Sequence, residues 1–489
     1  MFRKINFQEK YLALPLGLLL ALFFGWANPF SLDAKANTAV AIALLMVLWW
    51  VTEALPMPVV ALLPVILHPL FHLGTIEETT KAYSNPVIFL FMGGFLIGIA
   101  IEKWNLHKRI ALQIVSFTGT SGNKIILGFM IATAFLSMWL SNTATTMMMF
   151  PIALSVIRVM KEHPSETGNT HNFALALMLT LAYASNIGGM ATMIGTPPNI
   201  AYASFFEKKY GFTISFSDWM ALCIPISFLL LLALYIVLTG WLYPNRLYEN
   251  NNIQTYIQQE LKSLGPLSIA EKRILVIFVS TALLWIFKDL WNQLGIFKLD
   301  DTIIAMTGAL TLFATPAEGQ TNTKKQMLLK WSDTSVMSWG ILLLFGGGIA
   351  MANSLERTGI MTMIGHAFAD AASIKGVILI FLIATLSIFM SELMSNVAQV
   401  IVLAPVLAAV ADASGHNSLQ LGLAMTLAAS AASMLPMGTP PNAIVFSSNH
   451  IPLKEMLKTG LIMNLISIVV ITLLCRYLFP LIFQQSFHE

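Results

Sequence analysis

The chain has 489 residues, of which 57% are hydrophobic and only 10% are charged, with a net charge of +3. Soluble domains carry roughly 25% charged residues, so this composition excludes an ordinary soluble enzyme or binding domain and indicates a polytopic membrane protein. The two cysteines, Cys223 and Cys475, form no metal-binding or redox motif.

The first apolar run, residues 11–26, follows a basic start. It is long and has no clear cleavage site, so we interpret it as a retained helix within residues 1–37. Further apolar runs follow as far as residue 483, and several are shorter than the ~20 residues of a simple span. Short and broken segments are typical of transporters. The sequence therefore predicts an all-α polytopic membrane protein.

Residues 38–243 and 273–489 are two copies of one pattern. Four positions around a polar break recur 254 residues later without a gap: Ser137 and Ser391, Ser141 and Ser395, Asn142 and Asn396, and Pro151 and Pro405. The motif GTPPN also occurs twice, at 195–199 and at 438–442. Two motifs that recur in the same order indicate a duplication. Residues 244–272, which are polar, form the predicted cytoplasmic linker.

Each polar break lies between two apolar arms. The first break reads SNTATT at 141–146, and the second reads SNV at 395–397. The arms are about ten to sixteen residues long, short of the ~20 residues that a span needs. We therefore expect two re-entrant hairpins, at about residues 124–160 and 376–411, each entering and leaving the membrane on one side.

Without the hairpin arms, about eleven crossings remain, an odd number in each repeat plus the first helix. An odd number inverts the second repeat relative to the first, as in many secondary transporters. Most of the 27 Lys and Arg residues fall on the side of the N-terminus. The positive-inside rule then places the N-terminus in the cytoplasm and the C-terminus outside, and we expect an integral protein of a bacterial inner membrane.

The broken segments offer two kinds of ligand. Ser, Thr and Asn at a tip cap the following half-helix, whose N–H groups and positive partial charge attract a carboxylate. Carbonyl oxygens released at a break suit a hard cation such as Na⁺. We expect the tips and the GTPPN turns to face each other around a hydrated site. The hairpin cores contain no Lys or Arg, which favours symport of an anion with cations.

Two acids, Glu53 and Glu392, lie in apolar surroundings. Ionisable residues within membrane segments are functional candidates by default, and either acid could carry a proton or lie near a cation. For Glu53 we favour a simple position at the end of a span. For Glu392 the structural and functional interpretations stay open.

These motifs, together with WWVTEALPMPVVALLP and NPVIFLFMGGFLIGIAIEKWNLHKRIA, resemble the divalent anion:sodium symporters, the DASS family of INDY-type di- and tricarboxylate transporters. The resemblance covers about residues 40–446. It implies a homodimer that works as an elevator, with a scaffold domain from the early spans of each repeat. The hairpins and the helices after them would form the moving transport domain. Na⁺ would be the co-transported ion, with no organic cofactor.

The resemblance also implies site residues. The first sodium site would use Ser137, Ser141, Asn142 and Gly195, and the second would use Ser391, Met394, Asn396 and Gly438. The substrate carboxylates would contact Asn142, Thr143, Thr196, Ser395, Asn396 and Thr439. Many relatives have SNT at both tips, whereas this chain has Val397 at the second. We therefore expect Val397 to line the substrate site and to influence which anion is preferred.

The expected function is sodium-coupled symport of dicarboxylates such as succinate, malate and fumarate. The alternatives are a sodium-independent dicarboxylate exchanger, or a citrate or sulfate transporter of the same fold. An intramembrane serine protease is a different class. GTSG at 119–122 resembles its motif, but no apolar helix places a His opposite Ser121, and HExxH and GxxxxGK[ST] do not occur. We predict that the chain is not an enzyme and binds no nucleic acid.

Overall fold

The computed structural model describes residues 7–162, 169–247, 251–295, 298–317, 326–367 and 376–483. This part of the chain is helical, with one isolated β-bridge between Pro316 and Met327. Inside a bilayer a helix satisfies its own backbone N–H and C=O groups, which explains why apolar sequences of this kind fold into helices. The all-α prediction is confirmed.

Among the described residues, eight helices are long and apolar enough to cross a membrane. They are Ala34–Val51, Ile76–Lys103, Asn142–Lys161, Thr170–Met190, Phe216–Leu242, Trp339–Arg357, Asn396–Ser414 and Leu453–Phe483. Length and composition do not separate a crossing from a hairpin arm. The count of about eleven crossings therefore stays a prediction.

The first half of the chain forms these elements: α1 (Phe7–Ala27), α2 (Ala34–Val51), α3 (Met57–Val60), α4 (Leu63–Leu70), α5 (Ile76–Lys81), η1 (Ala82–Ser84), α6 (Pro86–Lys103), α7 (Leu106–Thr118), α8 (Gly122–Ser137), α9 (Asn142–Glu162), α10 (Thr170–Met190), α11 (Pro197–Tyr210), α12 (Phe216–Tyr235) and the π-helix η2 (Ile236–Leu242). Because α2 begins at Ala34, it starts a few residues before the repeat boundary expected at residue 38.

The second half begins with α13 (Asn251–Ser263), in the polar linker. The elements that follow are α14 (Ile269–Ile286), α15 (Lys288–Gln293), α16 (Asp301–Ala314), η3 (Trp331–Val336), α17 (Trp339–Arg357), α18 (Ile360–Ala367), α19 (Gly376–Ser391), α20 (Asn396–Ser414), α21 (Ser418–Ser430), α22 (Pro440–Phe446), α23 (Leu453–Tyr477) and α24 (Phe479–Phe483). Helix α14 starts at Ile269, inside the range 244–272 predicted for the linker, and the domain boundaries stay predictions.

The two segments expected as hairpins have matching helix boundaries. Helices α8 and α19 both have 16 residues, and their first and last residues lie 254 positions apart. After a short turn, α9 begins at Asn142 and α20 begins at Asn396. The polar residues of each tip therefore stop one helix and start the next at equivalent positions.

Helix α10 lies at the centre of the packing within the first predicted repeat. Every residue from Phe173 to Met190 is buried, and the helix contacts α8, α9, α12 and α22. Its counterpart α21 contacts α19, α20, α11 and α23. Each hairpin thus rests on a buried helix whose end leads into GTPPN.

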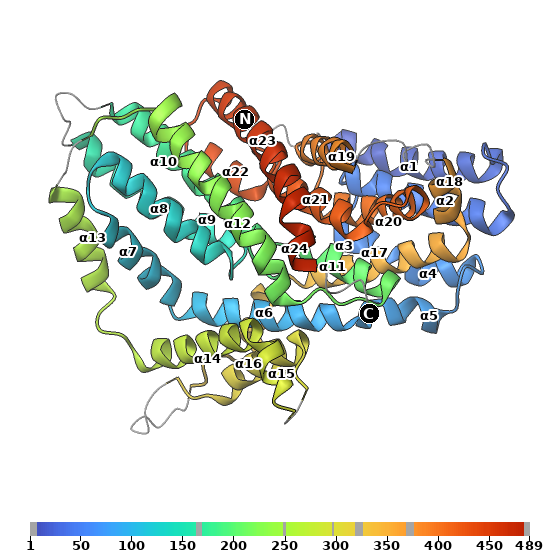
Figure 1. The fold of residues 1–489 in the computed structure, drawn as a ribbon, viewed down its shortest axis with the longest axis horizontal. Coiled ribbons are helices and arrows are strands. Elements are labelled where there is room, and N and C mark those ends of the chain that lie inside the picture. The colour runs from blue at the N-terminus through green and yellow to red at the C-terminus, as the bar shows by residue number, and fades with distance from the viewer. Residues whose placement is uncertain are drawn as a thin grey trace.

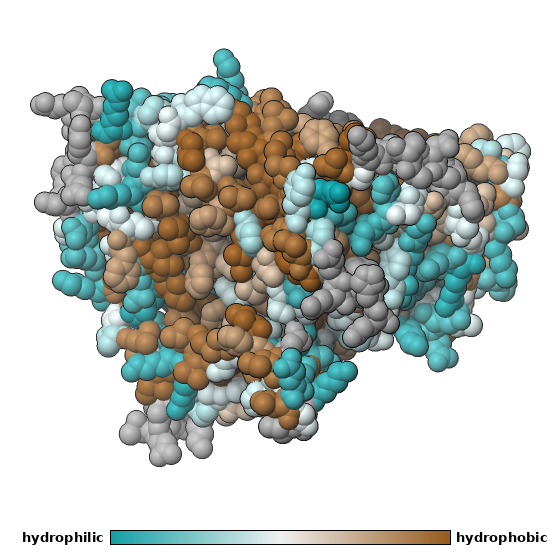
Figure 2. Space-filling model, viewed as in Figure 1, coloured by the Kyte–Doolittle hydropathy of each residue, from teal (hydrophilic) through white to brown (hydrophobic). Residues whose placement is uncertain are grey.

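Figure 1 shows α7, α8, α9 and α10 gathered at one end of the molecule, and α1, α2, α4 and α18 at the other. Helix α23 runs between them, while α14, α15 and α16 form a small layer beside α6. Figure 2 shows that the surface over α12 and α23 is hydrophobic and that hydrophilic residues collect towards the ends. On α12 and η2, Phe228 and Trp241 are 64% and 65% exposed. Such a surface suits contact with lipid chains, with Trp241 towards an edge.

Two ion pairs connect the repeats in equivalent places. Lys103 at the end of α6 pairs with Asp333 of η3 at 2.7 Å, and Arg357 at the end of α17 pairs with Glu78 of α5 at 2.8 Å. Lys103 and Arg357 are themselves 254 positions apart. Each repeat therefore binds the end of its glycine-rich helix to a short polar helix of the other repeat.

A third ion pair is more deeply buried. Arg109 of α7 donates to Glu271 of α14 at 2.7 Å and 3.3 Å, and their side chains are only 10% and 6% exposed. The guanidinium also donates to the carbonyl oxygens of Leu264 and Gly265. This bidentate geometry joins the amphipathic helix before the first hairpin to the start of the second repeat.

We expect Arg109→Ala to lower the free energy of unfolding by about 3–5 kcal/mol, because it leaves the buried Glu271 carboxylate without its partner. Lys108→Ala is the matched control. The Lys108–Glu260 pair is 30% exposed on each side, and such a pair contributes only about 0.2–1 kcal/mol. Denaturation of the detergent-solubilised protein measures both. Equal losses in the two variants would contradict the buried role of Arg109.

Candidate functional site

The first hairpin tip is closed by a side-chain contact across its turn. Ser137, the last residue of α8, donates from Oγ to Asn142 Oδ1 at 2.7 Å. Ser141 Oγ accepts from the Ala144 N–H at 3.2 Å, so the capping expected at this tip is confirmed. Ser137 is fully buried, whereas Asn142 is half-buried.

The second tip repeats the same contact. Ser391 Oγ donates to Asn396 Oδ1, again at 2.7 Å, and lies 2.6 Å from the carbonyl oxygen of Ala429. Ser395 precedes α20 as its N-cap residue, but its side chain makes no capping bond. The serine–asparagine pair is thus common to both repeats, while the cap is not.

The two GTPPN turns also share one interaction. Asn199 Nδ2 donates to the Thr192 carbonyl at 2.8 Å, and Asn442 Nδ2 donates to the Leu435 carbonyl at 3.1 Å. Both carbonyls lie seven residues before the asparagine, where the preceding helix has ended. Each asparagine therefore donates to a backbone oxygen that has lost its helical partner at the break.

At the first tip, the break and the hairpin are in direct contact. Thr192 Oγ1 donates to the Met138 carbonyl and accepts from the Gly195 N–H. A Cβ on Gly195 would lie 2.6 Å from the Gly189 oxygen and 2.9 Å from the Ser137 oxygen. Only glycine fits here, and its absence of a side chain lets carbonyl oxygens gather beside the turn.

Contacts between the repeats bring the motifs into one region. Asn186 of α10 donates to Thr439 Oγ1 of the second GTPPN turn at 3.0 Å. Helix α9 packs on α22, and α20 packs on α11. The second arm of each hairpin thus lies against the GTPPN helix of the other repeat.

The remaining expected site residues lie at the starts of the same helices. Thr196 and Thr439 are buried N-cap residues of α11 and α22. Three others are half-buried at the starts of α9 and α20: Thr143, Ser395 and Val397. Met394 is half-buried in the second turn, and Gly438 lies next to the carboxylate of Glu392.

The two acids have very different surroundings. Glu53 is exposed just after α2, in a left-handed backbone conformation with φ of 48°, which agrees with its interpretation as an acid at the end of a span. Glu392 is only 3% exposed, and its carboxylate accepts four hydrogen bonds at 2.7 to 2.9 Å. It is part of the hydrogen-bonded structure of the second tip.

Sequence reasoning missed several residues of this site. They are Ser185, which donates to the Asn142 carbonyl, together with Asn186, Gly189 and Thr192. All lie in or just after α10. A usable signal was present, because polar and glycine residues here interrupt a helix that is otherwise apolar and buried.

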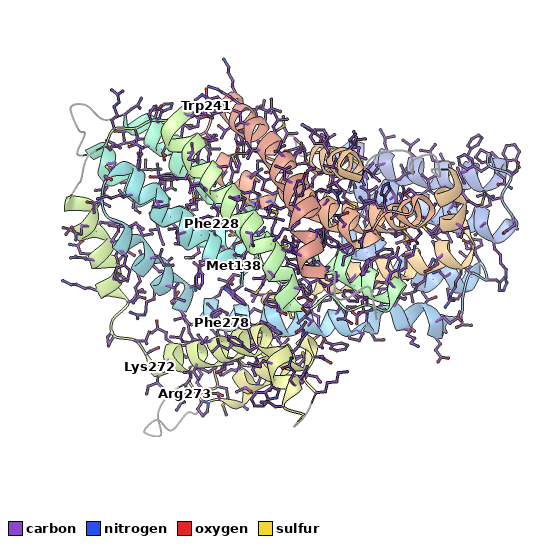
Figure 3. The ribbon with its side chains drawn as sticks, viewed as in Figure 1. Met138, Phe228, Trp241, Lys272, Arg273 and Phe278 are labelled. Carbon is purple, nitrogen blue, oxygen red and sulfur yellow. The ribbon has the colours of Figure 1, made fainter. Side chains whose placement is uncertain are left out.

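The first tip also docks on an aromatic cluster outside the hairpin. The Trp139 ring lies 5.0 Å from Phe278, 6.2 Å from Phe216 and 6.4 Å from Trp285, between ring centroids. Figure 3 shows the preceding residue, Met138, at the end of α8 nearest to α14, which carries Phe278. The residue equivalent to Trp139 is Leu393, which is 73% exposed. The two tips therefore share the serine–asparagine contact across the turn, but they differ in how the residue after Met138 or Glu392 packs against the rest of the protein.

Comparisons with known proteins agree with this architecture. Residues 9–483 match the family model described as the sodium:sulfate symporter transmembrane region. The sodium-dependent dicarboxylate transporter SdcS of Staphylococcus saprophyticus is 37% identical over 95% of this chain and 90% of the relative. SdcS of Staphylococcus aureus strain USA300 is 38% identical over 96% and 90%.

A solved structure gives independent support for the fold. Neisseria gonorrhoeae MtrF, from a class described as antimetabolite efflux pumps, aligns with a TM-score of 0.54 over 84% of each chain, at 12% identity. At this identity the similarity concerns the fold alone. The family match and the two staphylococcal relatives cover nearly the whole length, and they show that this chain belongs to the sodium:sulfate symporter (DASS) family.

Proposed function

We propose that the protein is a sodium-coupled symporter of small dicarboxylates of the succinate, malate and fumarate class. The observation that carries this proposal is the duplicated tip, in which Ser137–Asn142 and Ser391–Asn396 make one contact at equivalent positions. The relatives named as sodium-dependent dicarboxylate transporters support the choice of ion and substrate.

The first sodium site of this proposal is formed by Ser137, Ser141, Asn142 and Gly195. Support comes from the oxygen atoms gathered there. The Ser137 and Gly189 carbonyls approach Gly195, and Asn142 Oδ1 lies over Gly189. Hard cations such as Na⁺ bind such neutral oxygen ligands at unwound helix segments. Ser391, Met394, Asn396 and Gly438 form the proposed second site.

The substrate carboxylates bind at the starts of broken helices. Helices α9, α11 and α20 begin at Asn142, Pro197 and Asn396. Their N-terminal N–H groups and positive partial charges attract anions without a basic side chain. Seven residues at these starts and at α22 form the proposed substrate site: Asn142, Thr143, Thr196, Ser395, Asn396, Val397 and Thr439.

Transport then follows an elevator mechanism within a homodimer of the inner membrane, with the N-terminus in the cytoplasm and the C-terminus outside. The early helices of each repeat form the scaffold, and the hairpins with α10–α12 and α21–α23 form the moving domain. The hydrophobic surface in Figure 2 supports the membrane location, and the symmetric packing of α9 on α22 and of α20 on α11 supports motion of the hairpins as one body.

The function is tested in proteoliposomes that contain the purified protein. An inward Na⁺ gradient should drive accumulation of radiolabelled succinate, and replacing Na⁺ with K⁺ should remove this accumulation, because K⁺ does not supply the coupled ion. Vesicles loaded with succinate and free of Na⁺ provide the comparison, because they measure exchange without a sodium gradient. Uptake that is indifferent to Na⁺ but stimulated by internal dicarboxylate would identify an exchanger instead.

We expect Asn142→Ala and Asn396→Ala each to reduce sodium-driven succinate uptake by about 100-fold, because a hydrogen bond to a charged group contributes roughly 1.5–3 kcal/mol and each amide serves both ion and substrate. Size-exclusion chromatography and thermal unfolding confirm that the variants are folded. Near-normal uptake by either folded variant would refute the assignment of that tip.

The second tip provides a test of substrate choice. Val397→Thr keeps the shape of the side chain and adds a hydroxyl at the start of α20, where a carboxylate would accept a hydrogen bond. We expect the kcat/KM for succinate to rise relative to citrate by about three- to tenfold, the effect of one added hydrogen bond of about 1 kcal/mol. Competition of citrate against labelled succinate measures the ratio. An unchanged ratio would mean that this position does not select the anion.

A further inference from the structure

Glu392 lies within the second hairpin turn, directly after Ser391. Its Oε1 accepts from the N–H groups of Ser433 at 2.9 Å and Met434 at 2.7 Å, and its Oε2 accepts from the Leu435 N–H at 2.8 Å. These three consecutive N–H groups belong to the non-helical segment between α21 and the second GTPPN turn. One carboxylate therefore satisfies the donors of a whole stretch of broken backbone.

A fourth donor comes from another helix. Asn464 of α23 donates from Nδ2 to Glu392 Oε1 at 2.7 Å, and its Oδ1 lies 3.0 Å from the Ser433 nitrogen. Asn464 is fully buried, and Glu392 is 3% exposed. We call Glu392, Ser433, Met434, Leu435 and Asn464 the Glu392 cluster. The four partners of the carboxylate are neutral donors, so the cluster holds a buried charge by hydrogen bonds.

The first hairpin tip is also hydrogen-bonded to the broken segment before its GTPPN turn, but the side chain that makes the bond lies on the other partner. Glu392 is equivalent to Met138, which lies 254 residues earlier. The two GTPPN motifs lie 243 residues apart, and by this offset Leu435 is equivalent to Thr192. In the first repeat a side chain on the break, Thr192, donates to a backbone carbonyl on the tip, that of Met138. In the second repeat a side chain on the tip, Glu392, accepts from a backbone N–H on the break, that of Leu435.

The equivalence extends to the glycine of each motif. The Gly195 N–H donates to Thr192 Oγ1, and the Gly438 N–H donates to the Leu435 carbonyl, both at 3.1 Å. A Cβ on Gly438 would lie 2.8 Å from Glu392 Oε2. The carboxylate therefore lies against the glycine whose backbone belongs to the second sodium site of the proposed function.

We infer that Glu392 is a positioning residue, which locks the broken segment Ser433–Leu435 onto the second hairpin tip and thereby shapes the second sodium site; this rests on the proposed function. The buried carboxylate satisfies the N–H groups of Met434 and Leu435, which would otherwise lack a partner, and it shares the Ser433 N–H with Asn464 Oδ1. The carboxyl group also lies against Gly438 of the proposed second sodium site, whereas Met138 stands at the equivalent position of the first tip. Glu392 acts through the backbone that it holds and is not itself a ligand.

The test compares Glu392→Gln with wild type by two measurements. The glutamine keeps the shape of the side chain but turns an N–H donor towards backbone donors. We expect the Na⁺ concentration for half-maximal succinate uptake to rise by about tenfold or more, because bonds to a carboxylate are roughly twice as strong as neutral ones. Maximal uptake at saturating Na⁺ should stay close to the wild-type value. A residue needed only for folding would lower that maximum without changing the Na⁺ dependence.

The second measurement is hydrogen–deuterium exchange of the full chain in detergent, which reads the position of the backbone without transport. In Glu392→Gln, peptides that cover residues 431–438 should exchange faster, while peptides of the first turn around Thr192 should not change. Glu53→Gln is the matched control. It replaces another acid of the membrane region, exposed and distant from both tips in sequence, and should match wild type in both measurements.

Wild-type exchange at 431–438 together with wild-type Na⁺ dependence in Glu392→Gln overturns the inference. So does a loss of maximal uptake with no change in Na⁺ dependence. If Glu392→Gln does not fold, Asn464→Ala is tested instead. It removes the amide that donates to Glu392 and accepts from the Ser433 N–H, and it should raise the half-maximal Na⁺ concentration by about fivefold or more, since one hydrogen bond contributes about 1 kcal/mol; a wild-type value then refutes the inference. Absence of Na⁺-driven uptake in wild type refutes the proposed function instead, and the exchange result still decides whether Glu392 positions this segment.

Discussion

The structure depends on one constraint, which is that helices broken inside an apolar body must still satisfy their backbone N–H and C=O groups. Side chains fulfil it at each break. Asn199 and Asn442 bind the carbonyls that precede the GTPPN turns, and Thr192 and Glu392 join each turn to a hairpin tip. The groups that satisfy the backbone also hold the oxygen atoms and helix ends that the proposed ions and substrate need.

The two predicted repeats place equivalent residues at both tips, but the contacts that surround the tips differ. The Ser–Asn contact is the same at both tips, whereas Trp139 packs among aromatic rings and its counterpart Leu393 is exposed. Helix α7 carries the buried Arg109, and the equivalent residue of α18 is Met363. A transporter must present its site to the two sides of the membrane in turn. Two tips with the same serine–asparagine contact but different packing against the rest of the protein are compatible with two conformations of different stability.

Much of the local structure could be predicted from the sequence. The hairpin expected at about residues 124–160 spans α8 and α9, from Gly122 to Glu162, and the second begins at Gly376 as expected. The positions of these helices and of the turns between them could be predicted because a run of apolar residues, a polar break and a proline are local signals; the re-entrant path of both hairpins stays a prediction. Asn186, Thr192 and Gly189 were missed because their partners, Thr439, Met138 and Asn142, lie on other elements. The polar and glycine residues in and just after α10 mark these positions in the sequence, but they do not reveal which residues of other elements they contact.

The sequence by itself determined the membrane class, the matching motifs of the two predicted repeats, the position of both tips and the family resemblance, since composition and spacing are visible along one chain. Only the tertiary structure showed which groups surround Glu392. An acid in an apolar run can have a structural or a functional role, and its contacts in the folded protein distinguish the two. Here three backbone N–H groups more than 40 residues away and an amide of α23 surround the carboxylate. Burial forces an ionisable group to find partners, and folding alone determines which partners are within reach.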